Sequence, residues 1–170
     1  MNRIVPCPLP EGSLLSPYQR AGSYADCYTT RIDGTVSQAR YVAAFYTTRL
    51  FKLERLILRL AVSRPSTDSQ ALQLAHGQVE RFAAWTVEAR DKHQLLLCDL
   101  RGRTRSWLMT EALADGATCL YFGSAVVPVA DRHGGPARLG GFYRALLGFH
   151  RLYSKLLLRA ARSRLLAQVD

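Results

Sequence analysis

The chain has 170 residues, of which 48% are hydrophobic and 21% are charged. That length corresponds to one ordinary domain, and so large an apolar fraction excludes an intrinsically disordered or low-complexity chain. Lysine and arginine number 23 against 13 acidic residues, which gives a formal charge of +10. An excess of this size keeps anionic partners among the candidates.

The first 22 residues are rich in Pro, Gly and Ser, which predicts an irregular leader before a single α+β domain over residues 23–170. The N-terminus has no apolar run of about 7–15 residues, which a signal peptide would need. No stretch approaches the ~18 uninterrupted apolar residues of a membrane span. We therefore expect a cytoplasmic protein without integral membrane association.

Residues 23–32 are β-prone and predict a first strand, which the turn Asp33-Gly34 ends. A long amphipathic helix is expected next, because Ser37 can cap its start and Arg64-Pro65 stops it. Its apolar residues recur at helical spacing: Val42, Phe45, Tyr46, Leu53, Leu56, Ile57 and Leu60.

A second, shorter helix follows, with a cap supplied by Ser66, Thr67 or Asp68. His76-Gly77 marks its end, because Gly tolerates the left-handed conformation that is common at helix termini. Residues 78–84 are ambiguous and could extend this helix.

The following segment predicts a four-stranded antiparallel meander. Its β-prone runs are separated by the turn signals Asp91-Lys92, Arg101-Gly102 and Asp115-Gly116. The expected strands are Trp85–Arg90, Gln94–Leu100, Thr104–Glu111 and Thr118–Val127. A helical pattern returns from Arg138 to about Gln168, so the fold class is α+β, with elements in the order β-α-α-β-β-β-β-α.

Two-residue turns would gather the bulky side chains of the meander on one sheet face, which the C-terminal helix should cover. The space between them is either a plain core or a cavity for a ligand. The candidate ligand-binding residues are Trp85, Trp107, Met109 and Phe122 as apolar walls, with Arg105, Tyr143 and His150 as polar contacts. Arg105 either reaches water at the sheet rim or anchors a ligand from inside.

The positive charge is concentrated near the C-terminus. Residues 131–170 contain eight basic residues and two acids. Such a surface is either a solvated helix face or a docking site for an acidic protein, nucleic acid or anionic lipid. The candidate basic face of the C-terminal helix consists of Arg144, Arg151, Lys155, Arg159 and Arg162.

Motifs of catalysis or metal binding are absent from the sequence, which has no GxSxG, GxxxxGK[ST], GxGxxG or HExxH. We expect no metal and no cofactor. Glu88 and Asp99 could form an acid–base pair if the predicted strand register holds. The four cysteines lack CxxC and metal-ligand spacing, so a structural role is favoured over a metal or redox role: Cys7, Cys27, Cys98 and Cys119.

Two short segments carry a resemblance. Leu147–Ser154 and Phe122–Pro128 look like segments of uncharacterised bacterial proteins of the START-like superfamily, and the order of elements also resembles that helix-grip architecture. The resemblance implies a curved antiparallel sheet wrapped around the C-terminal helix, with a cavity for a lipid, polyketide or other hydrophobic ligand. An NTF2-like cone is the alternative fold.

Three functions are therefore in competition. The first is a non-enzymatic or weakly enzymatic domain that binds a hydrophobic small molecule between the sheet and the C-terminal helix. The second is an interaction module in which the basic helix face binds an anionic partner. The third is a cyclase or hydrolase on the same scaffold, with His150 or a carboxylate as base. A homodimer is compatible with each of them.

Overall fold

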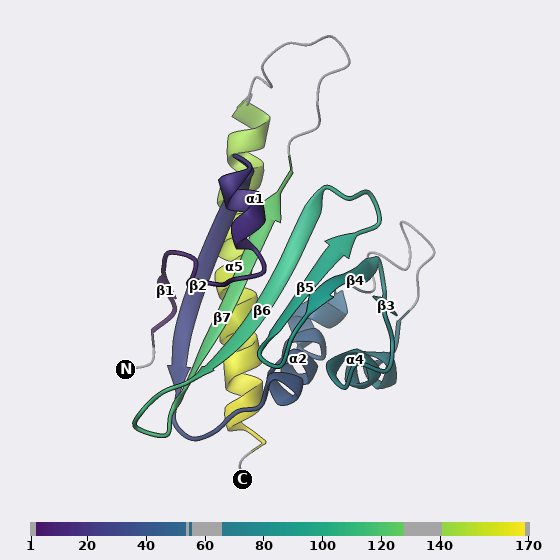
Figure 1. Cartoon of the computed structure of the whole chain (residues 1–170). Helices are drawn as coiled ribbons and strands as arrows, with labels where there is room; N and C mark the ends of the chain where they lie inside the picture. The colour runs from purple at the N-terminus through teal and green to yellow at the C-terminus, as the bar shows by residue number, and fades with distance from the viewer. Residues whose placement is uncertain (1–2, 54, 56–65, 128–140, 169–170) are drawn as a thin grey trace.

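Figure 1 shows the computed structural model, which describes residues 3–53, 55, 66–127 and 141–168, with the backbone alone for 141–150. The described residues form an α+β domain with a seven-stranded antiparallel sheet in the order β1-β2-β7-β6-β5-β4-β3. The strands are β1 (Val5–Pro6), β2 (Tyr24–Ile32), β3 (Arg81–Phe82), β4 (Trp85–Arg90), β5 (Gln94–Asp99), β6 (Thr104–Ala112) and β7 (Thr118–Val126). The helices are α1 (Ser16–Arg20), α2 (Gln38–Tyr46), α4 (Asp68–Ala75) and α5 (Gly141–Leu166).

The two faces of the sheet are covered differently. Helices α2, α4 and α5 pack on one face, which we call the helix face, and α1 lies on the other (Figure 1). The main core forms on the helix face, where Phe45 of α2 meets Phe122 of β7 with ring centroids 4.8 Å apart. The second face, called the leader face, holds a smaller cluster that residues 7–18 cover and to which they contribute Leu15. The buried members of this cluster are Leu15, Cys27, Leu96, Trp107 and Ala125.

All five predicted strands are confirmed to within one residue at each end. They correspond to β2, β4, β5, β6 and β7. The interpretation of residues 1–22 as wholly irregular is wrong, because β1 and α1 lie there. Residues 78–84 do not extend the second helix either, since they contain β3. Both missed strands have two residues, too few for a period-2 pattern to show in a sequence.

The expected long helix is interrupted after Tyr46. The hydroxyl of Thr47 donates to the Ala43 carbonyl at 2.6 Å, and helical structure begins again at Arg49. Thr48 starts the new helix, because its Oγ1 accepts from the Phe51 N–H at 3.1 Å as an N-cap does. The apolar residues keep their helical spacing across this break. Helical periodicity therefore did not predict the break, which depends on side-chain capping.

The second predicted helix is α4, and Thr67 is its cap. The Thr67 hydroxyl accepts from the backbone N–H of Gln70, whose side chain accepts from the N–H of Thr67 in return. This capping box satisfies two of the N–H groups that the first turn leaves free. The helix ends at the expected residue, with His76 as its C-cap.

The predicted sheet faces are wrong in two strands, each because of a one-residue shift. In β4 a bulge between Val87 and Ala89 changes the register, so that Trp85 lies opposite Asp99. The β4 residues before the bulge therefore lie on the sheet face opposite to the one that an uninterrupted strand would give them. Trp85 and Val87 consequently pack against the core of the helix face.

The second shift lies between β6 and β7, which five residues connect rather than the two assumed at Asp115-Gly116. Trp107 is therefore opposite Gly123 instead of Ser124, and Phe122 is opposite Leu108. This register places the apolar residues that were predicted to line one cavity on different faces. Phe122 packs on the helix face, whereas Trp107 and Met109 pack on the leader face.

Gly123 provides a test of this packing. A Cβ at Gly123 would lie 2.9 Å from Cε3 of Trp107, 2.9 Å from Cδ2 of Leu15 and 2.9 Å from the carbonyl oxygen of Asp26. We expect Gly123→Ala to lower the free energy of unfolding by roughly 1–3 kcal/mol, because well-packed neighbours must move. Chemical denaturation measures this change.

The comparison is Gly116→Ala, where the added Cβ meets nothing within 4 Å and only the positive φ of 80° opposes the substitution. Its expected cost is about 1 kcal/mol. A Gly123→Ala protein as stable as the wild type would contradict the close packing of the leader on the sheet.

Candidate functional site

The seven residues predicted to bind a ligand do not share one space. Trp107 is fully buried on the leader face, and its Nε1–H donates to Oε1 of Gln94 at 2.9 Å. Met109 packs beside it, whereas Trp85 and Phe122 belong to the core of the helix face. The side chains of Tyr143 and His150 lie outside the described residues.

Side chains of the sheet and of the C-terminal half of α5 pack against each other. Leu157, Leu158 and Ala161 of α5 are buried in the same cluster as Tyr28 of β2 and Phe122. These residues form part of the main core, and a ligand cavity elsewhere along the interface stays a hypothesis.

Arg105 has a partner in the protein. Its side chain is 12% exposed, and its Nε and Nη2 both lie 3.0 Å from Oε2 of Glu88. The Tyr18 hydroxyl donates to the same carboxylate, and the Arg105 guanidinium lies 4.6 Å from the centroid of the Tyr18 ring. Arg105 thus ties α1 to β4 and β6 on the leader face, and the expectation that it lies on the face under α5 is wrong.

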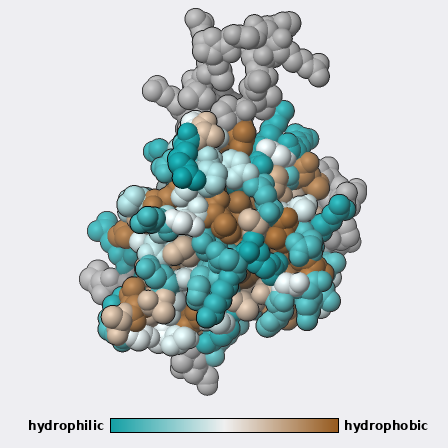
Figure 2. Space-filling model, in the orientation of Figure 1, coloured by the Kyte–Doolittle hydropathy of each residue, from teal (hydrophilic) through white to brown (hydrophobic). Residues whose placement is uncertain are grey.

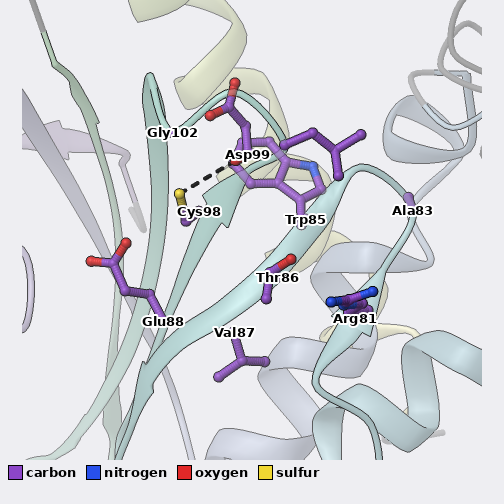
Figure 3. Close-up of a pocket in the computed structure, with 10 residues that line it drawn as sticks. Arg81, Ala83, Trp85, Thr86, Val87, Glu88, Cys98, Asp99 and Gly102 are labelled. Atoms are coloured by element: carbon purple, nitrogen blue, oxygen red, sulfur yellow. Dashed lines mark hydrogen bonds between the residues drawn. The ribbon is translucent and has the colours of Figure 1, made fainter.

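A pocket of about 480 Å³ opens beside this cluster, where β3, β4 and β5 meet the turn after β5 (Figure 3). Trp85 and Asp99 lie opposite each other on neighbouring strands, and Glu88 lines the same pocket from β4. Asp99 accepts from the backbone N–H groups of Arg103 and Thr104. Glu88 thus contacts Arg105 and Tyr18, whereas Asp99 contacts backbone N–H groups, and the acid–base pair stays a hypothesis.

The candidate site with unmatched charge is a groove of about 600 Å³ beside α5, which we call the basic groove. The N-terminal segment forms one wall and one side of α5 the other. Leu152 and Leu156 stand in it with 59% and 43% of their surface exposed. Its lining consists of Arg3, Ile4, Leu152, Lys155, Leu156, Arg159, Arg162 and Ser163.

Uncharged groups hold several cations of α5 in place. Nε of Arg162 donates to the carbonyl oxygen of Arg31 at 3.2 Å, and Nζ of Lys155 lies 5.4 Å from the centroid of the Tyr28 ring. Nε of Arg151 donates to the Tyr24 hydroxyl at 3.0 Å. Burial raises the pKa of that hydroxyl, so it stays protonated at neutral pH.

The basic groove therefore keeps its charge. Within the parts of the chain that the structure describes, no salt bridge joins a cation of α5 to a carboxylate. A carboxylate near these cations is that of Asp26, and it accepts hydrogen bonds from hydroxyl groups. Tyr24 donates to it at 3.1 Å and Ser124 at 2.6 Å. Cations anchored to neutral partners remain free to attract an external anion.

Four of the five predicted basic-face residues are described, and three of these four line the groove: Lys155, Arg159 and Arg162. Arg151 is exposed nearby on the same helix, and the side chain of Arg144 lies outside the described residues. Arg3 and Ile4 complete the groove and were not predicted from the sequence. Their position depends on the pairing of β1 with β2, which joins segments more than 20 residues apart.

The sequence matches no protein-family model. A search among curated proteins finds no match either. None of the described helices combines the length and apolar character that a membrane span requires. Function is therefore inferred from the geometry of this chain.

Arg105 offers a test of its structural role. We expect Arg105→Met to lower the free energy of unfolding by about 1–3 kcal/mol, because Glu88 would lose a charged partner in a partly buried position. Urea denaturation at neutral pH measures the change. Arg103→Met, at an exposed neighbouring position, is the matched control. Equal stability of the two variants would contradict this role of the Glu88 contact.

Proposed function

We propose that this domain is an interaction module that binds anionic lipid surfaces through the basic groove. The observation that carries the proposal is the set of α5 cations without carboxylate partners among the described residues, next to exposed Leu152 and Leu156. A helix with leucines between basic side chains suits the boundary between lipid headgroups and acyl chains.

The apolar part of the basic groove favours lipid over nucleic acid. Proteins that bind single strands stack bases on aromatic side chains, and the described groove lining contains none. Exposed leucines would add little to binding phosphates along a duplex. At a bilayer, however, Leu152 and Leu156 would enter the acyl boundary while Lys155 and Arg159 stay among the headgroups.

Binding would proceed in two physical steps. The positive field first draws the domain to an anionic surface, with roughly 1 kcal/mol from each cation near the headgroups. Burial of the leucines then adds a contribution that salt does not screen. Affinity should therefore fall steeply with ionic strength, to a smaller component that persists.

Vesicle binding tests the proposal. We expect the protein to sediment with phosphatidylcholine vesicles that contain about 30% phosphatidylglycerol and to leave them as salt rises from roughly 50 to 500 mM. Lys155→Glu with Arg159→Glu should weaken binding by at least roughly tenfold, because two attractive charges become repulsive. Leu152→Ser with Leu156→Ser should remove the component that persists at high salt.

Matched controls keep the net charge and hydrophobicity comparable. Arg101→Glu with Arg103→Glu reverses two exposed charges in the turn after β5, and Leu72→Ser removes a leucine that is 49% exposed on α4. These variants should bind like the wild type. Equal binding to neutral vesicles, or an equal loss in the controls, would contradict a lipid site at the groove, as would selective binding to an oligonucleotide.

A hydrophobic small molecule is the second candidate, together with a helix-grip relationship to the START-like superfamily. The antiparallel sheet against a long C-terminal helix supports that relationship. One observation favours a ligand: the hydroxyls of Thr30 and Ser154, buried on facing sides of the sheet and α5, have no hydrogen-bond partner among the described residues. A ligand with one polar group could satisfy them.

Native mass spectrometry of the freshly purified protein tests this second candidate. An occupied cavity predicts extra mass that disappears on denaturation, and the same spectrum gives the oligomeric state. Protein of bare mass after incubation with fatty acids or phospholipids would count against the cavity. It would leave the vesicle experiment unaffected, because that experiment concerns the outer side of α5.

A further inference from the structure

Two cysteines that are distant in sequence lie side by side on the leader face. The register of β1 with β2 pairs Val5 with Thr29 and Pro6 with Tyr28, so the next position sets Cys7 opposite Cys27. The backbone N–H of Cys7 donates to the Cys27 carbonyl at 3.0 Å. Their two Sγ atoms are 3.2 Å apart.

This geometry suits a disulfide bond. Directly opposed residues on antiparallel strands have Cα atoms about 4.5–5.5 Å apart, which lies within the range that disulfides span. The sulfur atoms need to approach by only about 1.2 Å to reach a bond of roughly 2.05 Å. Small side-chain rotations supply that movement without a change of backbone pairing.

The two thiols differ in access. Cys27 is 4% exposed beneath the leader, whereas Cys7 is only partly buried. The hydrogen bond between them lowers the pKa of Cys7 and, together with burial, raises the pKa of Cys27. Cys7 is thus the thiol that an external reagent meets and the one that ionises first.

We propose that Cys7 and Cys27 are a redox-active dithiol, a modification site that low-molecular-weight disulfides such as glutathione disulfide oxidise. The Cys7 thiolate attacks one sulfur of glutathione disulfide, forms a mixed disulfide and releases one glutathione thiolate. Cys27 then loses its proton and attacks the Cys7 sulfur, which expels the second glutathione. Two protein thiols are oxidised, one glutathione disulfide is reduced to two thiols, and the two protons pass to the glutathiones.

The other cysteines lack this arrangement. Sγ of Cys98 donates to the carbonyl oxygen of Asp99 at 3.3 Å, and Sγ of Cys119 contacts Oγ1 of Thr29 at 2.9 Å. Among the described residues, neither of these two sulfurs is hydrogen-bonded to a second sulfur as Cys7 is to Cys27. Oxidation should therefore select Cys7 and Cys27 among the four thiols.

The bond would fasten the leader to the sheet. The segment between the cysteines carries Leu15 and Tyr18, which pack on or beside Trp107. Closing this loop restricts the unfolded chain more than the folded one, because the leader already lies on the sheet. We expect the oxidised protein to melt on the order of 5 °C higher than the reduced protein.

The experiment equilibrates the folded protein in buffers of graded glutathione and glutathione disulfide, quenches it with acid and maps the disulfides by mass spectrometry. The expected result is one intramolecular bond between Cys7 and Cys27, reversible with dithiothreitol, and a higher Tm in the oxidised form. Cys7→Ser should stay fully reduced at Cys27. Cys98→Ser should oxidise like the wild type.

Three results would overturn the proposal. They are a stable mixed disulfide at Cys7 without a bond to Cys27, a bond that joins Cys27 to Cys119 instead, and oxidation of Cys27 that persists in Cys7→Ser. Cys27→Ala guards against misfolding of the serine variant, because alanine fits an apolar site. In that variant Cys7 should accumulate as the mixed disulfide, since the resolving thiol is missing. The proposal is independent of lipid binding.

Discussion

The pairing of β2 with β7 is the constraint on which the remaining structure depends. Nine positions of β2 face nine positions of β7, although about ninety residues separate them in the chain. This contact joins β2 to the strands from β4 to β7 and fixes the place of β1, which pairs with the other side of β2. It also forms the surface on which α5 packs, because α5 contacts both β2 and β7. The pairing of β2 with β7 therefore determines where the basic groove, the dithiol and the two cores lie.

The surface of Figure 2, seen from the side on which α1 lies, mixes hydrophilic and hydrophobic areas. Beneath it, Tyr18 and Arg105 engage Glu88, so the charge on this side is compensated. On α5, by contrast, Tyr24 and the Arg31 carbonyl hold arginines without neutralising them. The paired carboxylates therefore lie outside α5 among the described residues, and much of the excess positive charge lies along this one helix.

The longer strands, the caps Ser37 and Thr67 and the last helix could be predicted because their signals are local. Alternation along Thr104–Ala112 and the turn at Asp115 depend only on neighbouring residues. Which residues meet across strands could not be predicted, because one extra residue inverts a whole strand. Trp107 and Phe122 consequently lie on opposite faces although each of their strands was recognised. The basic stripe of α5 was visible as spacing, whereas the contribution of Arg3 required long-range pairing.

Both described edges of the sheet end in two-residue strands, β1 and β3. An exposed edge offers its free N–H and C=O groups to any other extended chain, and long flat edges are where β proteins aggregate. Short edges present too few of these groups for a second molecule to add a strand, and Pro6 removes one donor from β1. Along β1 and β3 the sheet thus offers few free backbone groups to another chain, and recognition along these strands falls to side chains.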